Sequence, residues 1–130
     1  MANMSWSVSV QISKGPTVTA AGPPRTIEAT DRVEVSLAPG DADKVVDLQP
    51  GDATAIRLLL IKSTRYGADL SFKASDGATD SAKVVLDGPQ LFTTGGAALF
   101  GMPPQKLKLT NTSADQTADV EIFVARDATP

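Results

Sequence analysis

The 130-residue sequence contains no histidine and no cysteine. Without histidine, the Ser-His and Cys-His forms of nucleophilic catalysis are excluded, and the commonest metal ligand is missing. Without cysteine there are no disulfides, no thiolate nucleophiles and no thiolate zinc sites. The side chains that most enzymes use for catalysis are therefore absent, and we expect a protein that is not an enzyme and that needs no cofactor.

Basic and aromatic residues are also scarce. The chain has 12 Lys and Arg against 15 Asp and Glu, a formal net charge of −3, and only 5% aromatic residues. A protein that binds phosphate backbones needs a basic face, so we expect no nucleic-acid partner. One tryptophan and one tyrosine also leave few platforms for a sugar.

Long hydrophobic runs are absent. The densest one, from Ala55 to Ile61, is interrupted by Arg57 and is far too short to span a bilayer. The stretch from Met1 to Trp6 has neither a basic region nor a continuous apolar region, which argues against a signal peptide. We therefore expect no membrane partner and no secretion.

Alternation of apolar and polar residues dominates what is present. From Ser5 to Ile12, the side chains of Trp6, Val8, Val10 and Ile12 alternate with polar ones, which predicts a strand with one buried face. Further segments with strand character lie at 26–38, 45–48, 54–63, 70–74, 82–86, 91–92, 97–100, 107–110 and 118–124. Turn residues separate them, and no segment has a convincing helical period.

Three of these segments leave alternatives open. Asp31 falls in the apolar phase of 26–38, so either a bulge lies there or two strands meet at Thr30-Asp31. Asp41 to Leu48 fits either one helical turn or a short strand. Thr93 to Gly96 suits a tight hairpin between its flanking strands.

The spacing of these strands predicts an all-β fold, a single antiparallel β-sandwich over residues 1–130. We expect jelly-roll-like topology, with an immunoglobulin-like arrangement as the alternative. Residues 1–25 are expected to form an extended N-terminal strand or arm, because Gly22-Pro23-Pro24 cannot join a central strand. A compact monomer of this mass exposes roughly 6,500 Å².

Acidic residues and Ser-Lys pairs are the remaining candidates for chemistry. The turn positions of the aspartates indicate solvated charge rather than a catalytic pair, and their spacing does not fit an EF-hand, so we assign no metal site. The residues considered are Asp41, Asp43, Asp47, Asp76, Asp80 and Asp87. Ser71 with Lys73, and Ser81 with Lys83, place a hydroxyl and an amine on one strand face, which is typical of an exposed polar row.

Apolar residues outside the expected core phase indicate a contact surface. In the segment 54–63, Ile56, Leu58 and Leu60 are expected on one side and Leu59 and Ile61 on the other, a pattern typical of a central strand or a subunit contact. The predicted interface residues are Trp6, Leu59, Ile61, Phe100, Met102 and Phe123. The alternative is that bulges return these side chains to the core.

Two stretches of the chain resemble small structural proteins of tailed bacteriophage particles. One is Leu60-Ile61-Lys62-Ser63, followed by Tyr66 and by Val85-Leu86-Asp87-Gly88-Pro89; the other runs from Lys108 to Asp115 and continues from Val120 to Asp127. The resemblance implies a capsid-decoration, head-fibre or tail-associated subunit, made in the bacterial host cytoplasm and assembled as trimers or larger rings. It brings no catalytic residues.

Two hypotheses for function follow. The first is a non-enzymatic virion subunit that binds capsid or tail proteins and forms a homo-oligomer, in which symmetric copies multiply weak contacts. The second is a binding module for carbohydrate or another ligand, which needs an exposed aromatic platform from Trp6, Tyr66 or a phenylalanine.

Overall fold

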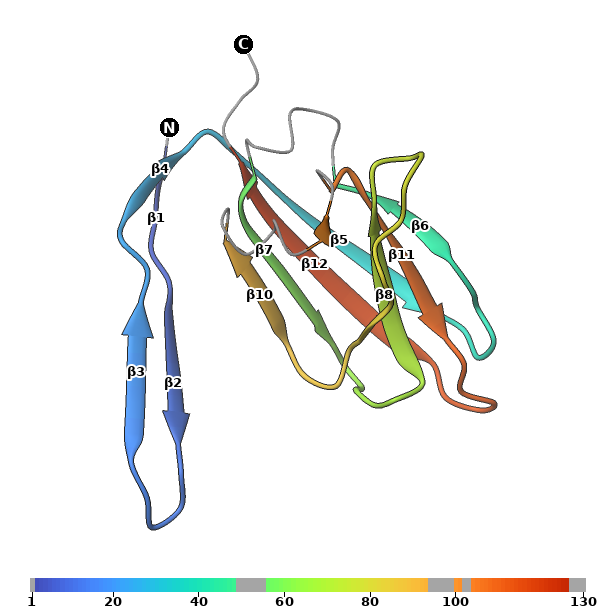
Figure 1. Cartoon of the computed structure of the whole chain (residues 1–130), viewed down its shortest axis with the longest axis horizontal. Coiled ribbons are helices and arrows are strands. Elements are labelled where there is room, and N and C mark those ends of the chain that lie inside the picture. The colour runs from blue at the N-terminus through green and yellow to red at the C-terminus, as the bar shows by residue number, and fades with distance from the viewer. Residues whose placement is uncertain (1, 49–55, 94–99, 102–103, 127–130) are drawn as a thin grey trace.

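The computed structural model describes residues 2–48, 56–93, 100–101 and 104–126, and the regular elements of this part of the chain are all strands. Two four-stranded antiparallel sheets pack face to face (Figure 1). The prediction of an all-β antiparallel sandwich is therefore confirmed. The preference for jelly-roll over immunoglobulin-like topology stays a prediction.

The sandwich is built from eight of the described strands. The first sheet has the order β10 (Gln90–Thr93), β7 (Ile56–Ser63), β12 (Ala118–Arg126) and β5 (Ala29–Leu37). The second sheet has the order β6 (Lys44–Asp47), β11 (Lys106–Asn111), β8 (Leu70–Ser75) and β9 (Val84–Val85). The other four strands form two-stranded ribbons: β1 (Ala2–Met4) with β4 (Arg25–Ile27), and β2 (Ser7–Gln11) with β3 (Thr17–Ala21).

The core lies between the two sheets and follows the period of two. In β12, Ala118, Val120, Ile122 and Val124 are all buried, as their alternation predicts. From the second sheet, the ring of Phe72 lies edge-on to Phe92 and Phe100, with ring centroids 6.3 Å away in both cases. Such edge-to-face contacts are favourable for aromatic rings, so they fix the packing at this end of the core.

A bulge in β7 decides which of its apolar side chains face the core. Ala125 of β12 pairs with Leu58, whereas the next residue pairs with Ile56, so Arg57 is an extra residue in the ladder. The bulge turns Ile56 into the main core together with Leu59 and Ile61. The expectation that Ile56 shares a face with Leu58 is therefore wrong.

The two open alternatives in the N-terminal half are resolved. Two strands, β4 and β5, meet at Glu28, which is earlier than the expected Thr30-Asp31. Asp31 occupies a position of the apolar phase, and its carboxylate is accommodated there because it forms an ion pair with Arg126 of the neighbouring strand. The segment 41–48 contains the short strand β6 and no helical turn. The hairpin expected at 93–96 falls largely outside the described residues.

The N-terminal strand differs from its prediction. Instead of one strand with a buried face over 5–12, the chain forms β1 and then β2, and every residue of β2 is exposed. The reason is that β2 pairs only with β3, and this two-stranded ribbon stands beside the sandwich rather than in it (Figure 1). We call residues 7–21, the two strands with their turn, the arm hairpin.

Candidate contact surface

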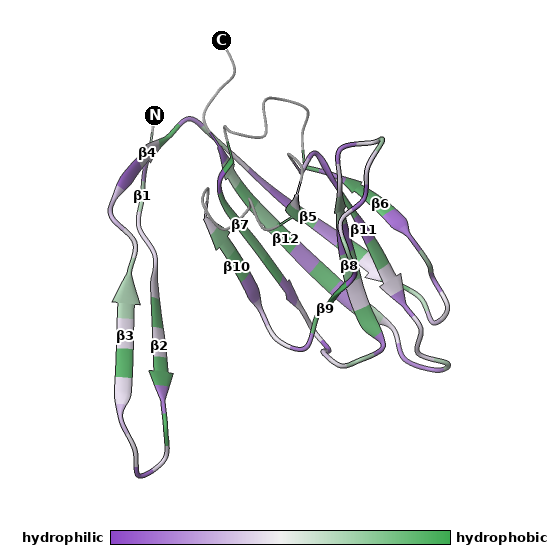
Figure 2. Ribbon diagram, in the orientation of Figure 1, coloured by the Kyte–Doolittle hydropathy of each residue, from purple (hydrophilic) through white to green (hydrophobic). Residues whose placement is uncertain are grey.

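The arm hairpin has one apolar face and one polar face. Val8 lies opposite Ala20 and Val10 opposite Val18, and directly paired residues project to the same side of a sheet. The alternation continues through Ile12, so the hydrophobic positions alternate with polar ones along both strands (Figure 2). Exposed fractions on the apolar face are 42% for Val8, 50% for Val10, 56% for Ile12 and 60% for Val18.

The root of the arm hairpin is held by a close contact between Trp6 and Gly22. The amide of Gly22 donates to the carbonyl oxygen of Trp6 at 3.1 Å. The indole lies so close over the glycine that an added Cβ would come within 2.2 Å of its ring atoms. Only glycine permits this approach, which directs Trp6 onto the apolar cluster of Ile27, Leu58 and Ala125.

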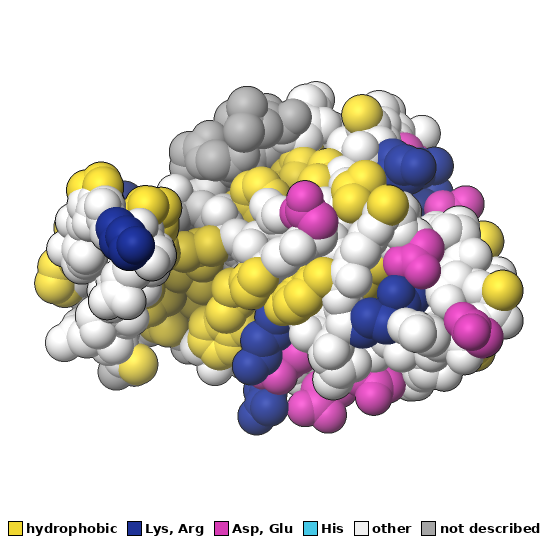
Figure 3. All heavy atoms as spheres, turned by 90° about the horizontal axis from the view of Figure 1, so that it is seen from below, with side chains coloured by type: hydrophobic (Ala, Val, Ile, Leu, Met, Phe, Trp, Pro, Cys, Tyr) yellow, Lys and Arg dark blue, Asp and Glu magenta, His cyan; other side chains and the backbone are white. Residues whose placement is uncertain are grey.

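A groove of about 940 Å³ separates the arm hairpin from the outer face of the first sheet. Its apolar walls are visible from below the molecule, where hydrophobic side chains gather on the sandwich opposite the hairpin (Figure 3). We call it the arm groove. Its lining consists of Asn3, Met4, Ser5, Trp6, Ser7, Val8, Ser9, Ile27, Leu58, Leu60, Pro89, Leu91 and Phe123, with no charged residue among them.

Charged residues occupy the same outer sheet face one row beyond the groove. The carboxylate of Glu121 accepts from Nε of Arg32 at 2.7 Å and lies 3.5 Å from Nζ of Lys62. The hydrogen bond and the positive charge of Arg32 lower the pKa of Glu121, and the same contact raises the pKa of Arg32. This face is therefore divided into an apolar half beside the arm and a paired, solvated half.

The structure separates the six predicted interface residues. Trp6 and Phe123 both line the arm groove. Leu59 and Ile61 have no exposed surface, and Phe100 is only 6% exposed, so all three belong to the main core and the expectation that they form a contact surface is wrong. The physical reason is that Leu59 and Ile61 have the phase of β7 that faces the opposite sheet, while the ring of Phe100 packs against Phe72 and Phe92. Met102 lies outside the described residues.

Sequence reasoning missed most of the groove and the exposed part of the arm. The sheet side of the groove comes from the opposite phase of the same strands, through Leu58, Leu60 and Leu91. The apolar alternation from Val8 to Ile12 was visible, but it indicated burial rather than a contact surface. The sequence of β7 is apolar on both faces, and this was the one sign that the outer side of the first sheet is also covered.

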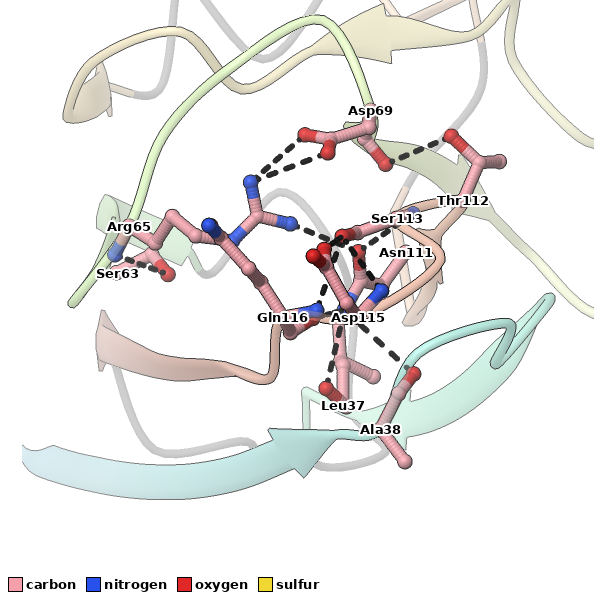
Figure 4. Close-up of polar contacts among 10 residues, drawn as sticks. All are labelled: Leu37, Ala38, Ser63, Arg65, Asp69, Asn111, Thr112, Ser113, Asp115 and Gln116. Atoms are coloured by element: carbon pink, nitrogen blue, oxygen red, sulfur yellow. Dashed lines mark hydrogen bonds and ion pairs between the residues drawn. The ribbon is translucent and has the colours of Figure 1, made fainter.

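Polar side chains gather at the opposite end of the sandwich around Asn111 (Figure 4). Arg65 donates to the carboxylate of Asp69 at 2.9 Å and to Oδ1 of Asn111 at 2.9 Å. The amide nitrogen of Asn111 donates to the carbonyl oxygens of Leu37 and Gln116 at 3.1 and 2.8 Å. These contacts tie three loops together, and they lower the pKa of Asp69, mainly through its hydrogen bond with Arg65.

Three of the aspartates in turns have hydrogen-bond partners within the chain. Asp41 accepts from the amide of Ala38 at 2.8 Å, and Asp76 accepts from the amides of Ala78 and Thr79, which lowers its pKa. Asp80 accepts from Lys108 at 2.9 Å. In the described part of the chain, no three acidic side chains come together as a metal site would require.

Two members of the predicted Ser-Lys pairs have contacts with other groups. The hydroxyl of Ser81 donates to the carbonyl oxygen of Ala82 and accepts from the amide of Ala74, so its hydrogen bonds are local. Nζ of Lys73 lies 4.0 Å from the carboxylate of Asp43. Lys73 lies on the sheet surface, where an ion pair contributes little to stability, whereas Ser71 is buried and is not part of the expected exposed row.

Comparison with known proteins gives no relative. No protein-family model, curated protein or solved structure matches this chain. The described residues form no helix long and apolar enough for a membrane span.

Proposed function

We propose that this protein is a non-enzymatic structural subunit that forms a homo-oligomer through its arm hairpin and serves in a bacteriophage virion. One observation supports the self-association above all others. Four β-branched side chains of one short hairpin lie on one face with 42–60% of their surface exposed. Contiguous exposed apolar surface of this kind usually marks association, whereas single scattered residues do not.

The energy of covering this face is comparable to the cost of association. Complete burial of a Val or Ile side chain contributes about 1.5–3 kcal/mol, so the exposed halves of four such residues contribute roughly 3–6 kcal/mol. Two arms in a symmetric pair contribute about twice that, against an association cost of about 4–15 kcal/mol. The contact is therefore weak in a pair and is strengthened when many symmetric copies assemble.

The virion role rests on the resemblance to phage structural proteins, which implies capsid or tail proteins as further partners. A β-sandwich with an apolar arm suits a lattice subunit, because the arm adds a contact without altering the sandwich core. In this role the protein is made in the host cytoplasm and ends in the particle. Cosedimentation of the purified protein with assembled capsids or tails tests this part of the proposal.

Self-association is tested by sedimentation velocity at micromolar concentration. The test variant is Val10→Lys with Val18→Lys, a directly opposed pair on the apolar face. The matched control is Gln11→Lys with Thr17→Lys, the neighbouring opposed pair on the polar face, and neither residue lines the arm groove. We expect the wild type and the control to form the oligomer and the apolar-face variant to remain a 13.5 kDa monomer.

A wild type that is monomeric throughout the micromolar range contradicts the proposed self-association. Equal loss of the oligomer in both lysine pairs contradicts the role of the apolar face, because charge alone then explains the effect. If the protein also fails to sediment with capsids and tails, the structural role itself is overturned.

A second candidate function is a ligand-binding module, favoured by the half-buried Trp6 beside Asn3 and Ser5 in the arm groove. Tyr66 is not a second platform, since it packs on the core and its hydroxyl oxygen accepts from the amide of Ser63. A glycan array tests this candidate together with tryptophan emission during titration. Absence of any hit and of any emission change would remove it.

A further inference from the structure

We propose that the arm hairpin of one copy docks in the arm groove of a second copy. This inference rests on the proposed self-association and specifies where the arm binds. The apolar floor formed by Leu60, Leu91 and Phe123 would receive the apolar face formed by Val10, Ile12 and Val18.

The arm groove and the arm hairpin match each other chemically, because both are apolar and almost free of charge. No lining residue of the arm groove is charged, so a charged guest would lose its hydration without gaining a partner. The arm is uncharged from Ser5 to Ser13, and its one charge, Lys14, stands in the turn at the tip. The same chain thus supplies both an uncharged apolar groove and an uncharged apolar guest.

The size of the groove suits a chain segment. Its volume of about 940 Å³ is far larger than a single water molecule needs, so waters occupy the groove of one chain. These waters lie against walls built largely from Met4, Leu58, Leu60, Leu91 and Phe123, which offer them no side-chain hydrogen bonds. Their release by an apolar guest is favourable.

The surface area of the chain also fits a two-copy contact. One copy exposes 7417 Å², about 900 Å² more than a compact monomer of this mass exposes. If docking removes this excess from both copies, it buries about 1,800 Å², which falls in the range of standard stable interfaces. Reciprocal exchange, in which each copy gives one arm and receives one, achieves this in a single symmetric contact.

The arm is placed to reach a neighbour. It joins the sandwich only through its root, and its tip extends away from the body (Figure 1). A hairpin of two strands is marginally stable in water and gains most from a third surface. The connection through Gly22 and Pro23-Pro24 keeps the two root segments extended. An exchanged arm therefore requires no change within the sandwich.

Site-specific crosslinking tests the docking, because the chain has no cysteine of its own. Val10→Cys and Leu91→Cys are prepared separately, mixed at micromolar concentration and oxidised. We expect a product of twice the 13.5 kDa monomer mass in the mixture, in higher yield than in either variant alone. The matched control, Gln11→Cys mixed with Leu91→Cys, places the thiol on the polar face at a residue that does not line the groove, and should give a lower yield.

The emission of the single tryptophan provides an independent measurement. Trp6 lines the arm groove and is half-buried in one chain, so docking should shift its emission to shorter wavelength as protein concentration rises. The Val10→Lys, Val18→Lys variant leaves Trp6 and the groove intact but lacks an apolar guest. We expect no concentration-dependent shift in that variant.

The outcomes separate this inference from the proposed function. If the wild type oligomerises but Val10→Cys and Gln11→Cys give equal yields with Leu91→Cys, the arm docks elsewhere and this inference is overturned. If one chain that has both Val10→Cys and Leu91→Cys forms only an internal link, identified by peptide mapping of the monomer, the arm occupies its own groove and the inference is likewise overturned. A wild type without any oligomer overturns both proposals.

Discussion

Replacement of Asn111 by alanine should destabilise the sandwich more than any other polar substitution in the loop region around it. Asn111 is completely buried at the end of β11. Its amide nitrogen donates to two main-chain carbonyl oxygens, and its Oδ1 accepts from Arg65 at 2.9 Å and from the amide of Ser113 at 3.1 Å. One side chain therefore satisfies polar groups from three separate segments of the chain.

The expected loss follows from these four hydrogen bonds. A buried polar group left without a partner costs about 1–3 kcal/mol, and a hydrogen bond to a charged group is worth about 1.5–3 kcal/mol. Some of the freed groups gain water after the substitution, because this end of the sandwich is near solvent. We therefore expect Asn111→Ala to lower the free energy of unfolding by about 3–5 kcal/mol, and the melting temperature by roughly 10–20 °C.

Urea unfolding measures this loss directly. The midpoint should fall while the dependence of the free energy on urea concentration stays unchanged. Asn111→Asp keeps the acceptor for Arg65 but loses the donors to Leu37 and Gln116, so it should also be strongly destabilised. Thr112→Ala is the control, since its exposed hydroxyl makes one bond to the carbonyl oxygen of Asp69. A loss below about 1 kcal/mol for Asn111→Ala would refute the reasoning.

Three further predictions concern the arm, the core and pH. Gly22→Ala should expel the indole of the single tryptophan and shift its emission to longer wavelength. Gly88→Ala is the control, because a Cβ added there meets nothing within 4 Å and should leave the emission unchanged. Equal emission spectra of the two variants would contradict the close contact between Trp6 and Gly22. Ile61→Ala should lower the free energy of unfolding by about 2–5 kcal/mol, because Ile61 is fully buried in the core. Phe123→Ala should mainly weaken oligomer formation in sedimentation velocity, because Phe123 lines the arm groove. If instead Ile61→Ala weakens the oligomer and Phe123→Ala lowers the stability, Ile61 is an interface residue as the sequence predicted. Asp69 has a lowered pKa in the folded state, so its contribution to stability is present above about pH 4 and is lost as pH falls through the folded pKa. The difference in unfolding free energy between wild type and Asp69→Asn, measured in urea, should therefore shrink between pH 7 and pH 3. A difference that stays constant would show that the carboxylate of Asp69 does not cause it.

The sandwich was predictable because its strands alternate cleanly. The last strand shows this best, since each apolar residue from Ala118 to Val124 in the expected phase is buried. In contrast, β7 is apolar on both sides, so its sequence identifies a covered strand without telling which side faces the other sheet. The bulge at Arg57 depends on pairing with β12, which no local pattern reveals.

The polar end of the sandwich was not predictable for a related reason. In the sequence, Asn111 begins a stretch of turn residues, and turn residues are usually exposed. Its burial results from the approach of Arg65, Leu37 and Gln116, which come from different loops and strands. A contact among segments that far apart depends on the strand order of both sheets, and alternation within single strands contains no information on that order.

In the arm hairpin, the burial that the sequence pattern predicts differs from the exposure found in a single chain. This difference supports the proposed assembly. The alternation of Val8, Val10 and Ile12 with polar residues is the pattern of a strand with one covered face, yet in one chain that face is exposed. An arm that served only as a solvated linker would need no such alternation, since polar residues would keep it soluble without risk of aggregation. A second copy that covers the face removes the conflict, because the buried side that the sequence indicates is then supplied by the neighbour.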